Sequence, residues 1–169
     1  VNIPTQNIYI PSGTTSNFPA FCAWYEQRIA DCGGIDLQIL GIGSDGHIAF
    51  NEPSSSLQSR TRLKTLAKPT IDDNARFFDR REDVPIYAIT MGVGTILEAR
   101  EIILVANGEK KADAIAQAVE GPVTSMITAS ALQFHPDAKV YVDAPAASKL
   151  RMGDYYTWIQ EKKPGAPRQ

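Results

Sequence analysis

The amino-acid sequence predicts an α/β domain with a largely parallel sheet covered by helices. Its 169 residues, of which 43% are hydrophobic, suit one globular domain with one core. Short apolar runs bounded by Gly or Asn-Gly alternate with stretches of helical character, which is the pattern of strands connected by helices. These runs are apolar on both faces, as in a parallel sheet covered on both sides. We therefore predict a single domain over residues 1–169.

Capping residues and glycines set the boundaries of the expected elements. Ser16-Asn17-Phe18-Pro19 supplies a cap and an early proline and Gly33 supplies a stop, which together predict one amphipathic helix. The predicted strands are 35–40, 84–91, 101–106 and a short last strand at 139–142. The further predicted helices are 95–99, 110–119 and 148–160. Residues 52–59 are expected to form a polar loop and residues 162–169 a flexible tail.

The charge balance argues against several classes of partner. The chain has 17 basic and 19 acidic side chains, a net charge of -2 and no long block of like charge. Neither nucleic acid nor an anionic membrane is therefore the expected partner. No apolar segment approaches the roughly 20 residues of a membrane span, and the N-terminus lacks the pattern of a secretory signal. A small-molecule site in a cytoplasmic protein is the resulting expectation.

The cysteines and histidines indicate neither a disulfide nor a structural metal. Cys22 and Cys32 fall within one helical pattern, which places them about 15 Å apart at ~1.5 Å per residue. Disulfide Cα atoms lie within roughly 7 Å of each other. The two histidines, His47 and His135, belong to no cluster with zinc-site spacing. His135 precedes a proline and is expected to be packed or bonded to the backbone.

The stretch GIGSDGHIAFNEP, residues 41–53, is the strongest candidate for a functional site. It follows a predicted strand, and ligands of open α/β sheets bind beyond the carboxyl ends of strands. His47 is flanked by Asp45 and Glu52. A carboxylate that holds one imidazole nitrogen fixes the tautomer and leaves the other nitrogen free for proton transfer. The pattern therefore favours an acid/base histidine.

Three other interpretations of this stretch remain open. Gly41, Gly43 and Gly46 match the G-x-G-x-x-G fingerprint of dinucleotide sites, but Asn-Glu-Pro and a serine run follow where that motif requires a helix. The glycines can equally make a plain tight turn with a backbone-bonded histidine and solvated acids. Asp45, His47 and Glu52 can also be viewed as a metal site, although with one nitrogen ligand.

The longer run GIGSDGHIAFNEPSSSLQSRTRLKTL closely resembles the signature region of glucosamine-6-phosphate deaminases, in the glucosamine/galactosamine-6-phosphate isomerase family. The likeness continues through Asn74-Ala75-Arg76-Phe77-Phe78 and Leu132-Gln133-Phe134-His135-Pro136 and covers nearly the whole chain. The related 6-phosphogluconolactonases share the Asp-Gly-His turn but continue differently. The residues Ile48 to Pro53 match the deaminases.

The resemblance implies an open, mostly parallel, Rossmann-like sheet with helices on both faces. It also implies conversion of glucosamine 6-phosphate and water to fructose 6-phosphate and ammonia, without a redox cofactor or catalytic metal. By the same resemblance His47 opens the sugar ring, with Asp45 and Glu52 setting its orientation and charge. Arg76 and Lys111 match the residues that bind the substrate phosphate, for which a guanidinium fork and an ammonium are suited.

The resemblance further implies a regulatory site and an assembly. Positions that bind the effector N-acetylglucosamine 6-phosphate between subunits, in regulated members, are matched here by Ser55, Ser56, Arg62 and Lys64. A homo-oligomer, often a hexamer, is implied as well. The second glycine turn, Gly92-Val93-Gly94-Thr95, either presents backbone near the sugar or is a plain strand-to-helix turn.

One departure from the family is large. Its members carry an upstream half with the first strands, a phosphate loop and the acid for the C2 proton, and none of this precedes Val1. The sequence is therefore expected to be the C-terminal part of a longer fold, catalytically incomplete alone unless an acid such as Asp36 or Asp143 substitutes. Its uncovered strands should favour association or poor solubility. The alternatives are a noncatalytic phosphosugar-binding or regulatory protein and a lactonase-like hydrolase.

Overall fold

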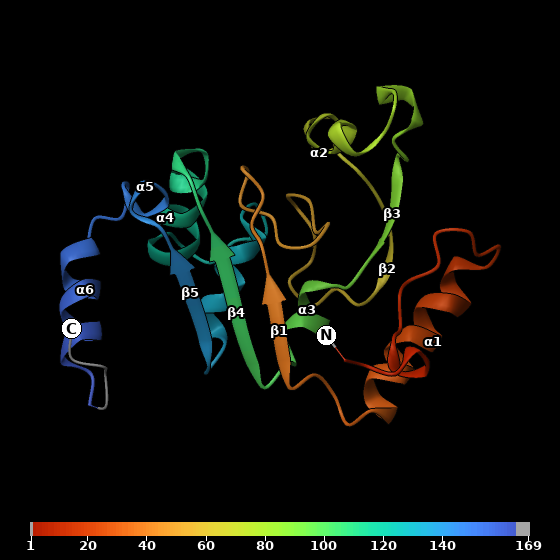
Figure 1. Ribbon diagram of the computed structural model, residues 1–169, viewed down its shortest axis with the longest axis horizontal. Helices are drawn as coiled ribbons and strands as arrows, with labels where there is room; N and C mark the ends of the chain where they lie inside the picture. The colour runs from red at the N-terminus through yellow and green to blue at the C-terminus, as the bar shows by residue number, and fades with distance from the viewer. Residues whose placement is uncertain (1, 165–169) are drawn as a thin grey trace.

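The computed structural model describes residues 2–164 and is organised around a three-stranded parallel sheet (Figure 1). Its strands are β1 (Leu37–Leu40), β4 (Glu101–Ala106) and β5 (Ala138–Val142), in the order β1-β4-β5. The register pairs Leu40 with Leu104, and Leu104 with Val140. The predicted α/β class with a parallel sheet is thus confirmed, and all three strands fall where the apolar runs predicted them.

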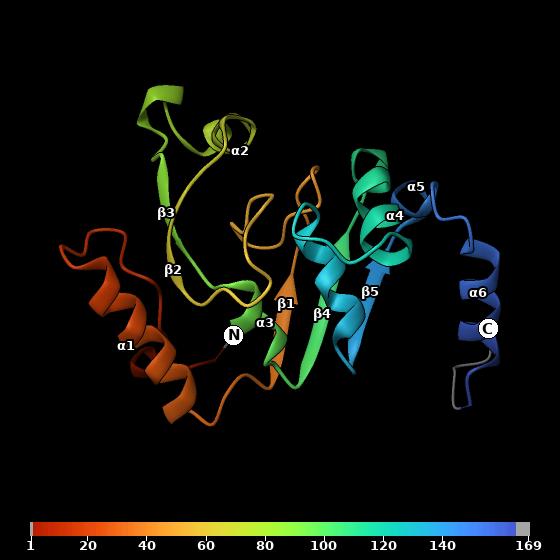
Figure 2. The same cartoon turned by 180° about the vertical axis from the view of Figure 1, so that it is seen from behind.

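One face of this sheet packs against helices and forms the core. The helices are α3 (Val93–Leu97), α4 (Ala112–Glu120) and the 3₁₀ helix η5 (Thr128–Phe134), which lie in front of the sheet in Figure 2. Every second residue of β4 points into them, and this covered face consists of Ile102, Leu104 and Ala106, with Leu40 from β1. The period of two in burial follows from the pleat of a strand.

The opposite face of the sheet carries apolar side chains that the described residues leave uncovered. We call Leu37, Ile39, Val105 and Tyr141 the open face, and their exposed fractions are 45%, 66%, 50% and 55%. β1 is also an edge strand, because β4 is its sheet neighbour and no other described strand pairs with it. The prediction of strands buried on both sides therefore holds for the covered face alone.

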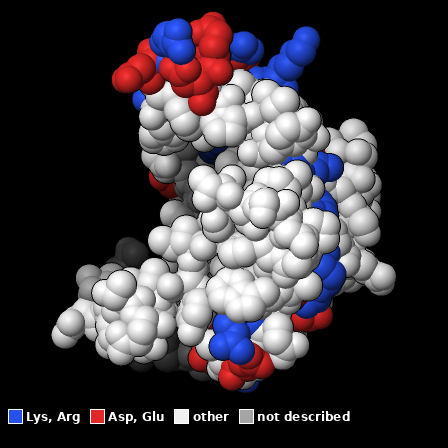
Figure 3. All heavy atoms as spheres, turned by 90° about the vertical axis from the view of Figure 1, so that its right-hand side faces the viewer, with Lys and Arg blue, Asp and Glu red and all other residues white. Residues whose placement is uncertain are grey.

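A separate antiparallel ribbon rises beside the main sheet. It pairs β2 (Arg62–Thr65) with β3 (Tyr87–Thr90), so the strand predicted at 84–91 is real but has an antiparallel partner. Its far end carries α2 (Lys68–Asn74), η2 (Ala75–Phe77) and η3 (Arg81–Asp83). Charged side chains gather there in Figure 3, with Arg81 paired to Asp72, above a largely uncharged middle of this face.

The N-terminal part of the chain contains η1 (Thr5–Asn7) and α1 (Phe18–Asp31). The predicted cap is confirmed, because Asn17 accepts a hydrogen bond from the Ala20 N–H, and Gly33 follows the helix with φ +86°. α1 contacts β2 and lies beside the ribbon (Figure 1). Cys22 and Cys32 are both free thiols, as predicted.

The helix predicted at 148–160 is present but begins later, at Gly153. After η4 (Glu109–Lys111) and α4, the chain forms α5 (Ala144–Ala147) and a distinct α6 (Gly153–Lys162). The break is stabilised by Glu120, whose carboxylate accepts hydrogen bonds from the backbone N–H groups of Arg151 and Met152. The predicted tail at 162–169 begins at the last residue of α6, and residues 165–169 lie outside the described part. Within residues 2–164, the helices are too short or too polar to cross a membrane.

Candidate active site

The loop of residues 41–53, here called the histidine loop, leaves the carboxyl end of β1 and folds back on itself. The Gly43 N–H donates to the His47 carbonyl at 2.8 Å, and the Gly46 N–H donates to the Gly43 carbonyl at 3.1 Å. Gly46 has φ +84°, a conformation that favours glycine. A Cβ on Gly43 would lie 2.6 Å from the His47 ring and 2.7 Å from Asp45 Oδ1. The imidazole thus lies directly over the backbone of the turn.

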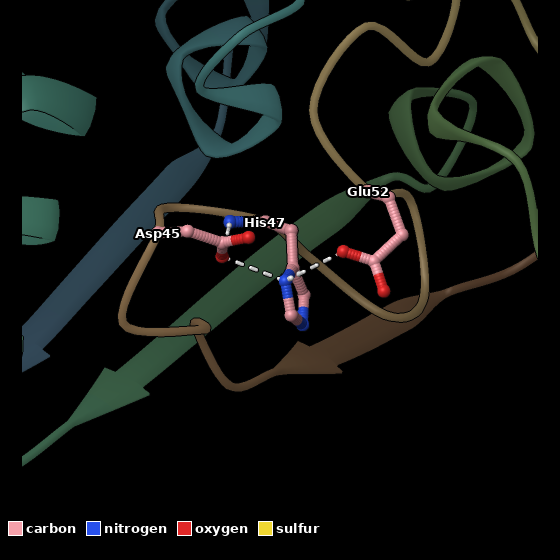
Figure 4. Close-up of side chains that lie close together, drawn as sticks. All are labelled: Asp45, His47 and Glu52. Carbon is pink, nitrogen blue, oxygen red and sulfur yellow. Dashed lines mark hydrogen bonds and ion pairs between the residues drawn. The ribbon is translucent and has the colours of Figure 1, made fainter. Parts of the chain in front are cut away.

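His47 lies between two carboxylates (Figure 4). Its Nδ1 is 2.7 Å from Asp45 Oδ1 and 3.8 Å from Glu52 Oε2. The ring is mostly buried, with 15% of the side chain exposed, whereas its Nε2 edge points away from both acids. The predicted grouping of Asp45, His47 and Glu52 is therefore what the loop builds. Neither Nδ1 nor Glu52 Oε2 has an aligned hydrogen bond within residues 2–164.

The two carboxylates are themselves held by backbone groups. Asp45 Oδ1 accepts from the His47 N–H at 3.2 Å, which fixes the acid beside its own turn. Glu52 is almost fully buried, and its Oε1 accepts from the Ala67 N–H at 3.0 Å. Ala67 is the residue before α2, so Glu52 joins the histidine loop to the helix at the end of the ribbon. Both acids are thereby oriented before any ligand binds.

Three buried polar side chains, which the sequence reasoning missed, hold the backbone of the histidine loop. Thr128 Oγ1 accepts from the Ile48 N–H at 3.2 Å, and Thr90 Oγ1 accepts from the Phe50 N–H at 3.1 Å. Asn51 Nδ2 donates to the carbonyl of Ile48 at 3.0 Å. Position at the carboxyl end of a strand is a signal that marks Thr90, whereas Thr128 lies 80 residues from its partner and carries no local signal. Ala49, with φ +50°, is kept by these bonds in a sparsely populated conformation.

A cavity of about 280 Å³ opens beside His47. It is also lined by Phe50 of the histidine loop, Asp73 and Asn74 of the ribbon end, Arg76 of η2 and Lys111 of η4. The residues predicted for substrate phosphate, Arg76 and Lys111, thus converge from distant parts of the chain. Neither has an ion-pair partner within residues 2–164, and the Arg76 guanidinium lies 4.8 Å from the centre of the Phe77 ring. The cavity therefore offers two cations and an imidazole to one ligand.

The residues predicted to bind an effector lie directly after the histidine loop and in β2 of the ribbon. We call this region the ribbon side of the loop. Ser55 is buried and its hydroxyl has no partner within residues 2–164, whereas the Ser56 hydroxyl accepts from the Gln58 N–H at 3.2 Å. Arg62 is half-buried, and this desolvation lowers the pKa of its guanidinium. Lys64 is on the same side of β2 as Arg62, two residues along. Their role as an effector site stays a prediction.

The second glycine turn, Gly92-Val93-Gly94-Thr95, packs closely against the backbone at Ser59. A Cβ on Gly92 would lie 1.9 Å from the Ser59 carbonyl oxygen, and that oxygen accepts from the Gly94 N–H at 2.9 Å. The Val93 N–H donates to the Ser59 hydroxyl at 3.0 Å. Of the two interpretations that the sequence left open, these contacts support the strand-to-helix turn, which here docks the chain between the histidine loop and β2.

The alternative interpretations of the loop also have structural outcomes. No helix begins at Gly46 in the described chain, so the dinucleotide fingerprint lacks the N-terminus that would bind a pyrophosphate. Asp45, His47 and Glu52 each offer one ligand atom within 4.8 Å of the others, which is close enough to share a cation. His135 is bonded to the backbone as predicted, because its Nε2 lies 2.7 Å from the Ala99 carbonyl and its Nδ1 accepts from the Asp137 N–H.

Comparison with known proteins gives one consistent result. Residues 1–141 match the family model of glucosamine-6-phosphate isomerases/6-phosphogluconolactonase. The chain is 52% identical over 164 residues to the glucosamine-6-phosphate deaminase of Pseudarthrobacter chlorophenolicus, covering 97% of this chain and 63% of the relative. It is 57% identical over 155 residues to that of Streptomyces coelicolor, covering 91% of this chain and 59% of the relative. The chain thus spans about three-fifths of these relatives.

Solved structures support the same relationship. A monomeric glucosamine-6-phosphate deaminase is 43% identical with a TM-score of 0.81, over 83% of this chain and 58% of that one. A 6-phosphogluconolactonase from Thermotoga maritima is 16% identical with a TM-score of 0.60, over 83% of this chain and 57% of that one. At that identity the second likeness shows the fold alone.

Proposed function

The chain belongs to the family of glucosamine-6-phosphate isomerases and 6-phosphogluconolactonases, and on this premise we propose that it acts in the deamination of glucosamine 6-phosphate. The products are fructose 6-phosphate and ammonia, which places the reaction in amino sugar metabolism. One observation carries the proposal: His47, fixed between Asp45 and Glu52, shares a cavity with Arg76 and Lys111. Glucosamine-6-phosphate deaminases that are 52–57% identical also match over 91–97% of this chain.

The proposed chemistry begins with opening of the sugar ring. One group must take the proton of the anomeric hydroxyl and return a proton to the ring oxygen. Imidazole, with a reference pKa of about 6.5, can act in both directions near neutral pH. The Nε2 edge of His47 points away from both carboxylates and is available to the sugar, while the acids at Nδ1 stabilise the imidazolium that forms.

Binding of the substrate phosphate is proposed for Arg76 and Lys111. The guanidinium can contact two phosphate oxygens at once and the ammonium adds a point charge. Asp36 and Asp143, considered from the sequence as acids for the C2 proton, have other contacts. Asp36 pairs with Arg100 at 2.5 Å, and Asp143 accepts hydrogen bonds from Gly108 and Ala146. We assign the C2 step to neither of them.

The decisive experiment combines an assay for ammonia and fructose 6-phosphate with calorimetric binding of glucosamine 6-phosphate. Binding together with ammonia release supports the proposal. Binding without ammonia favours the noncatalytic phosphosugar-binding alternative. Hydrolysis of 6-phosphogluconolactone without deamination favours the lactonase-like alternative, for which the structural likeness provides only the fold. Arg76→Gln should weaken phosphosugar binding, whereas Arg80→Gln, which removes a cation paired with Asp83 outside the cavity, should not.

We propose a regulatory role for the ribbon side of the loop, in which Ser55, Ser56, Arg62 and Lys64 bind the phosphate of N-acetylglucosamine 6-phosphate. The half-buried guanidinium of Arg62, which has no carboxylate partner within residues 2–164, supports the proposal. Calorimetry with N-acetylglucosamine 6-phosphate tests it: Arg62→Gln should abolish binding that Arg76→Gln leaves intact. Loss of binding in Arg76→Gln with binding retained in Arg62→Gln would place the ligand in the His47 cavity instead.

A homo-oligomer, which can be a hexamer, is proposed on the basis of the open face. Apolar patches of this kind mark interfaces more often than monomer surfaces. Light scattering over a range of concentrations tests this, and a stable monodisperse monomer would contradict it.

We propose the cytoplasm as the compartment, since both thiols are free and a reducing environment keeps them so. Cell fractionation is the corresponding test.

A further inference from the structure

Asn51 occupies a central position in the histidine loop. Its side chain is fully buried, and its amide nitrogen donates to two carbonyls, that of Ile48 at 3.0 Å and that of Met91 at 2.9 Å. Its backbone N–H donates to the same Ile48 carbonyl at 3.1 Å, and its own carbonyl accepts from Thr128 Oγ1 at 3.0 Å. Asn51 therefore fixes the backbone directly after His47 and directly before Glu52.

The remaining atom of the Asn51 amide, Oδ1, is bonded to the ribbon. Its Oδ1 accepts a hydrogen bond from Arg62 Nη1 at 2.9 Å, and the same nitrogen donates to the Arg60 carbonyl at 3.2 Å. No carboxylate lies within ion-pair distance of Arg62 in residues 2–164. A guanidinium has five N–H donors, so Arg62 retains donors for an anion while it holds Asn51.

We propose that Asn51 is a positioning residue that couples the state of Arg62 to the geometry of His47. The amide group is planar, so a displacement of Oδ1 toward or away from Arg62 also displaces Nδ2. Nδ2 holds the Ile48 carbonyl, which is one peptide from His47. An anion that draws the guanidinium away from Asn51 thus changes the support of the imidazole. The inference deepens the proposed function and rests on it for the roles of His47 and Arg62.

The groups that face the His47 ring define what can perturb it. Asp45 and Glu52 approach Nδ1, and Asp73, Arg76 and Lys111 line the cavity beside the ring. Arg62 does not line that cavity. An effect of Arg62 on the ring by contact therefore passes through the histidine loop, and a second charge removal on β2 controls for the long-range field of the charge.

The test uses ¹H–¹³C spectra of the whole chain, in which two histidines give two ring Cε1–H signals. Arg62→Gln should shift the His47 signal and leave the His135 signal in place, because the His135 ring is held by Ala99 and Asp137. Lys64→Gln is the matched control: it removes the same charge two residues along β2 and should leave His47 unchanged. These substitutions change side chains that are only partly buried, so a folding defect does not obscure the result.

A second comparison assigns the effect to Asn51. In an Asn51→Ala background, Arg62→Gln should no longer shift the His47 signal, which is the non-additivity of a double-mutant cycle. If Asn51→Ala does not fold, Asn51→Asp replaces it, since a carboxylate keeps an acceptor for Arg62 but loses both donors. An unmoved His47 signal in Arg62→Gln, or an equal shift in both backgrounds, would overturn the inference. Failure of the proposed function appears instead as absent glucosamine 6-phosphate binding and leaves these spectra as expected.

Discussion

The histidine loop and the open face both adjoin β1, yet a polar side chain is buried in the loop and an apolar one is exposed on the open face. In the loop, Asn51 is fully buried although it is polar, because each of its hydrogen-bonding groups has a partner. On the open face, Ile39 is 66% exposed although it is apolar, because nothing in the described chain covers it. Burial is therefore decided by available partners, and hydropathy alone does not report it. A buried polar side chain whose groups are all hydrogen-bonded, such as Asn51, is a rigid support, whereas an exposed apolar face is a surface to be covered.

The largest effect is expected from the catalytic group that the loop supports. His47→Gln removes the proton-transfer group while it keeps the size and polarity of the side chain, so turnover on the cyclic substrate should fall about 10²–10⁴-fold. Binding of glucosamine 6-phosphate should change much less. Steady-state kinetics and calorimetry on an active enzyme measure the two quantities. Equal losses in turnover and binding would indicate that His47 has a structural role and that the histidine loop does not support a proton-transfer group.

The two faces of the sheet provide the next contrast. Ile102→Ala on the covered face should cost about 2–5 kcal/mol of unfolding free energy, because it creates a cavity in the core. Ile39→Ala on the open face should cost less than about 1 kcal/mol and should also reduce self-association. Denaturant unfolding and light scattering of both variants test this pair. Similar losses of stability in the two would mean that the open face is covered in solution.

A smaller effect is expected from the buried hydroxyl at the base of the loop. Thr128→Val keeps the shape of the side chain but leaves the Ile48 N–H and the Asn51 carbonyl without this partner, at a cost of about 1–3 kcal/mol. Thr65→Val, at an exposed position of β2, is the control and should be nearly neutral. Unfolding curves that coincide for the two variants would contradict the view that partners decide burial in the loop.

The smallest effect concerns pH and a partly buried acid, Glu26 of α1. Burial alone would raise the pKa of Glu26, but hydrogen bonds from Thr61, Thr95 and Arg60 outweigh it and lower the pKa below the usual value. The carboxylate therefore adds stability above its unfolded pKa, and this contribution is lost as pH falls through the folded value. The difference in unfolding free energy between wild type and Glu26→Gln should shrink on acidification from neutral pH. A constant difference would show that its ionisation is not coupled to folding.

Much of the fold was accessible from sequence where the signal is local. The start of α1 was predicted because Asn17 and Pro19 act within one turn, and β4 because an unbroken apolar run is bounded by charge and glycine. The pairing of β3 with β2 depends on a contact between separate segments, which no local pattern records. The helix predicted at 148–160 begins only at Gly153, after Glu120 of α4 accepts hydrogen bonds from the backbone N–H groups of Arg151 and Met152.

The candidate site divides in the same way. Asp45, His47 and Glu52 were recognised because they lie within eight residues of one another, and Arg76 and Lys111 were added by family resemblance. Asn51 was overlooked although it adjoins Glu52, because its role lies in contacts with Met91 and Arg62. Thr128 could not be found, since the loop that it supports is 77–80 residues away. The reactive groups are local, whereas their supports are distant in sequence.

The edge of β1 that no strand of residues 2–164 occupies has a consequence for how assembly and chemistry are related. A strand that added to this edge in parallel would end beside Gly41, because the carboxyl ends of parallel strands meet at the same rim of a sheet. Any helix connected to such a strand would be delivered onto Ile39 and its neighbours. The added strand and its helix would cover the open face and would at the same time bring new side chains to the His47 cavity. A molecule whose sheet lacks that strand would therefore also lack part of the cavity wall.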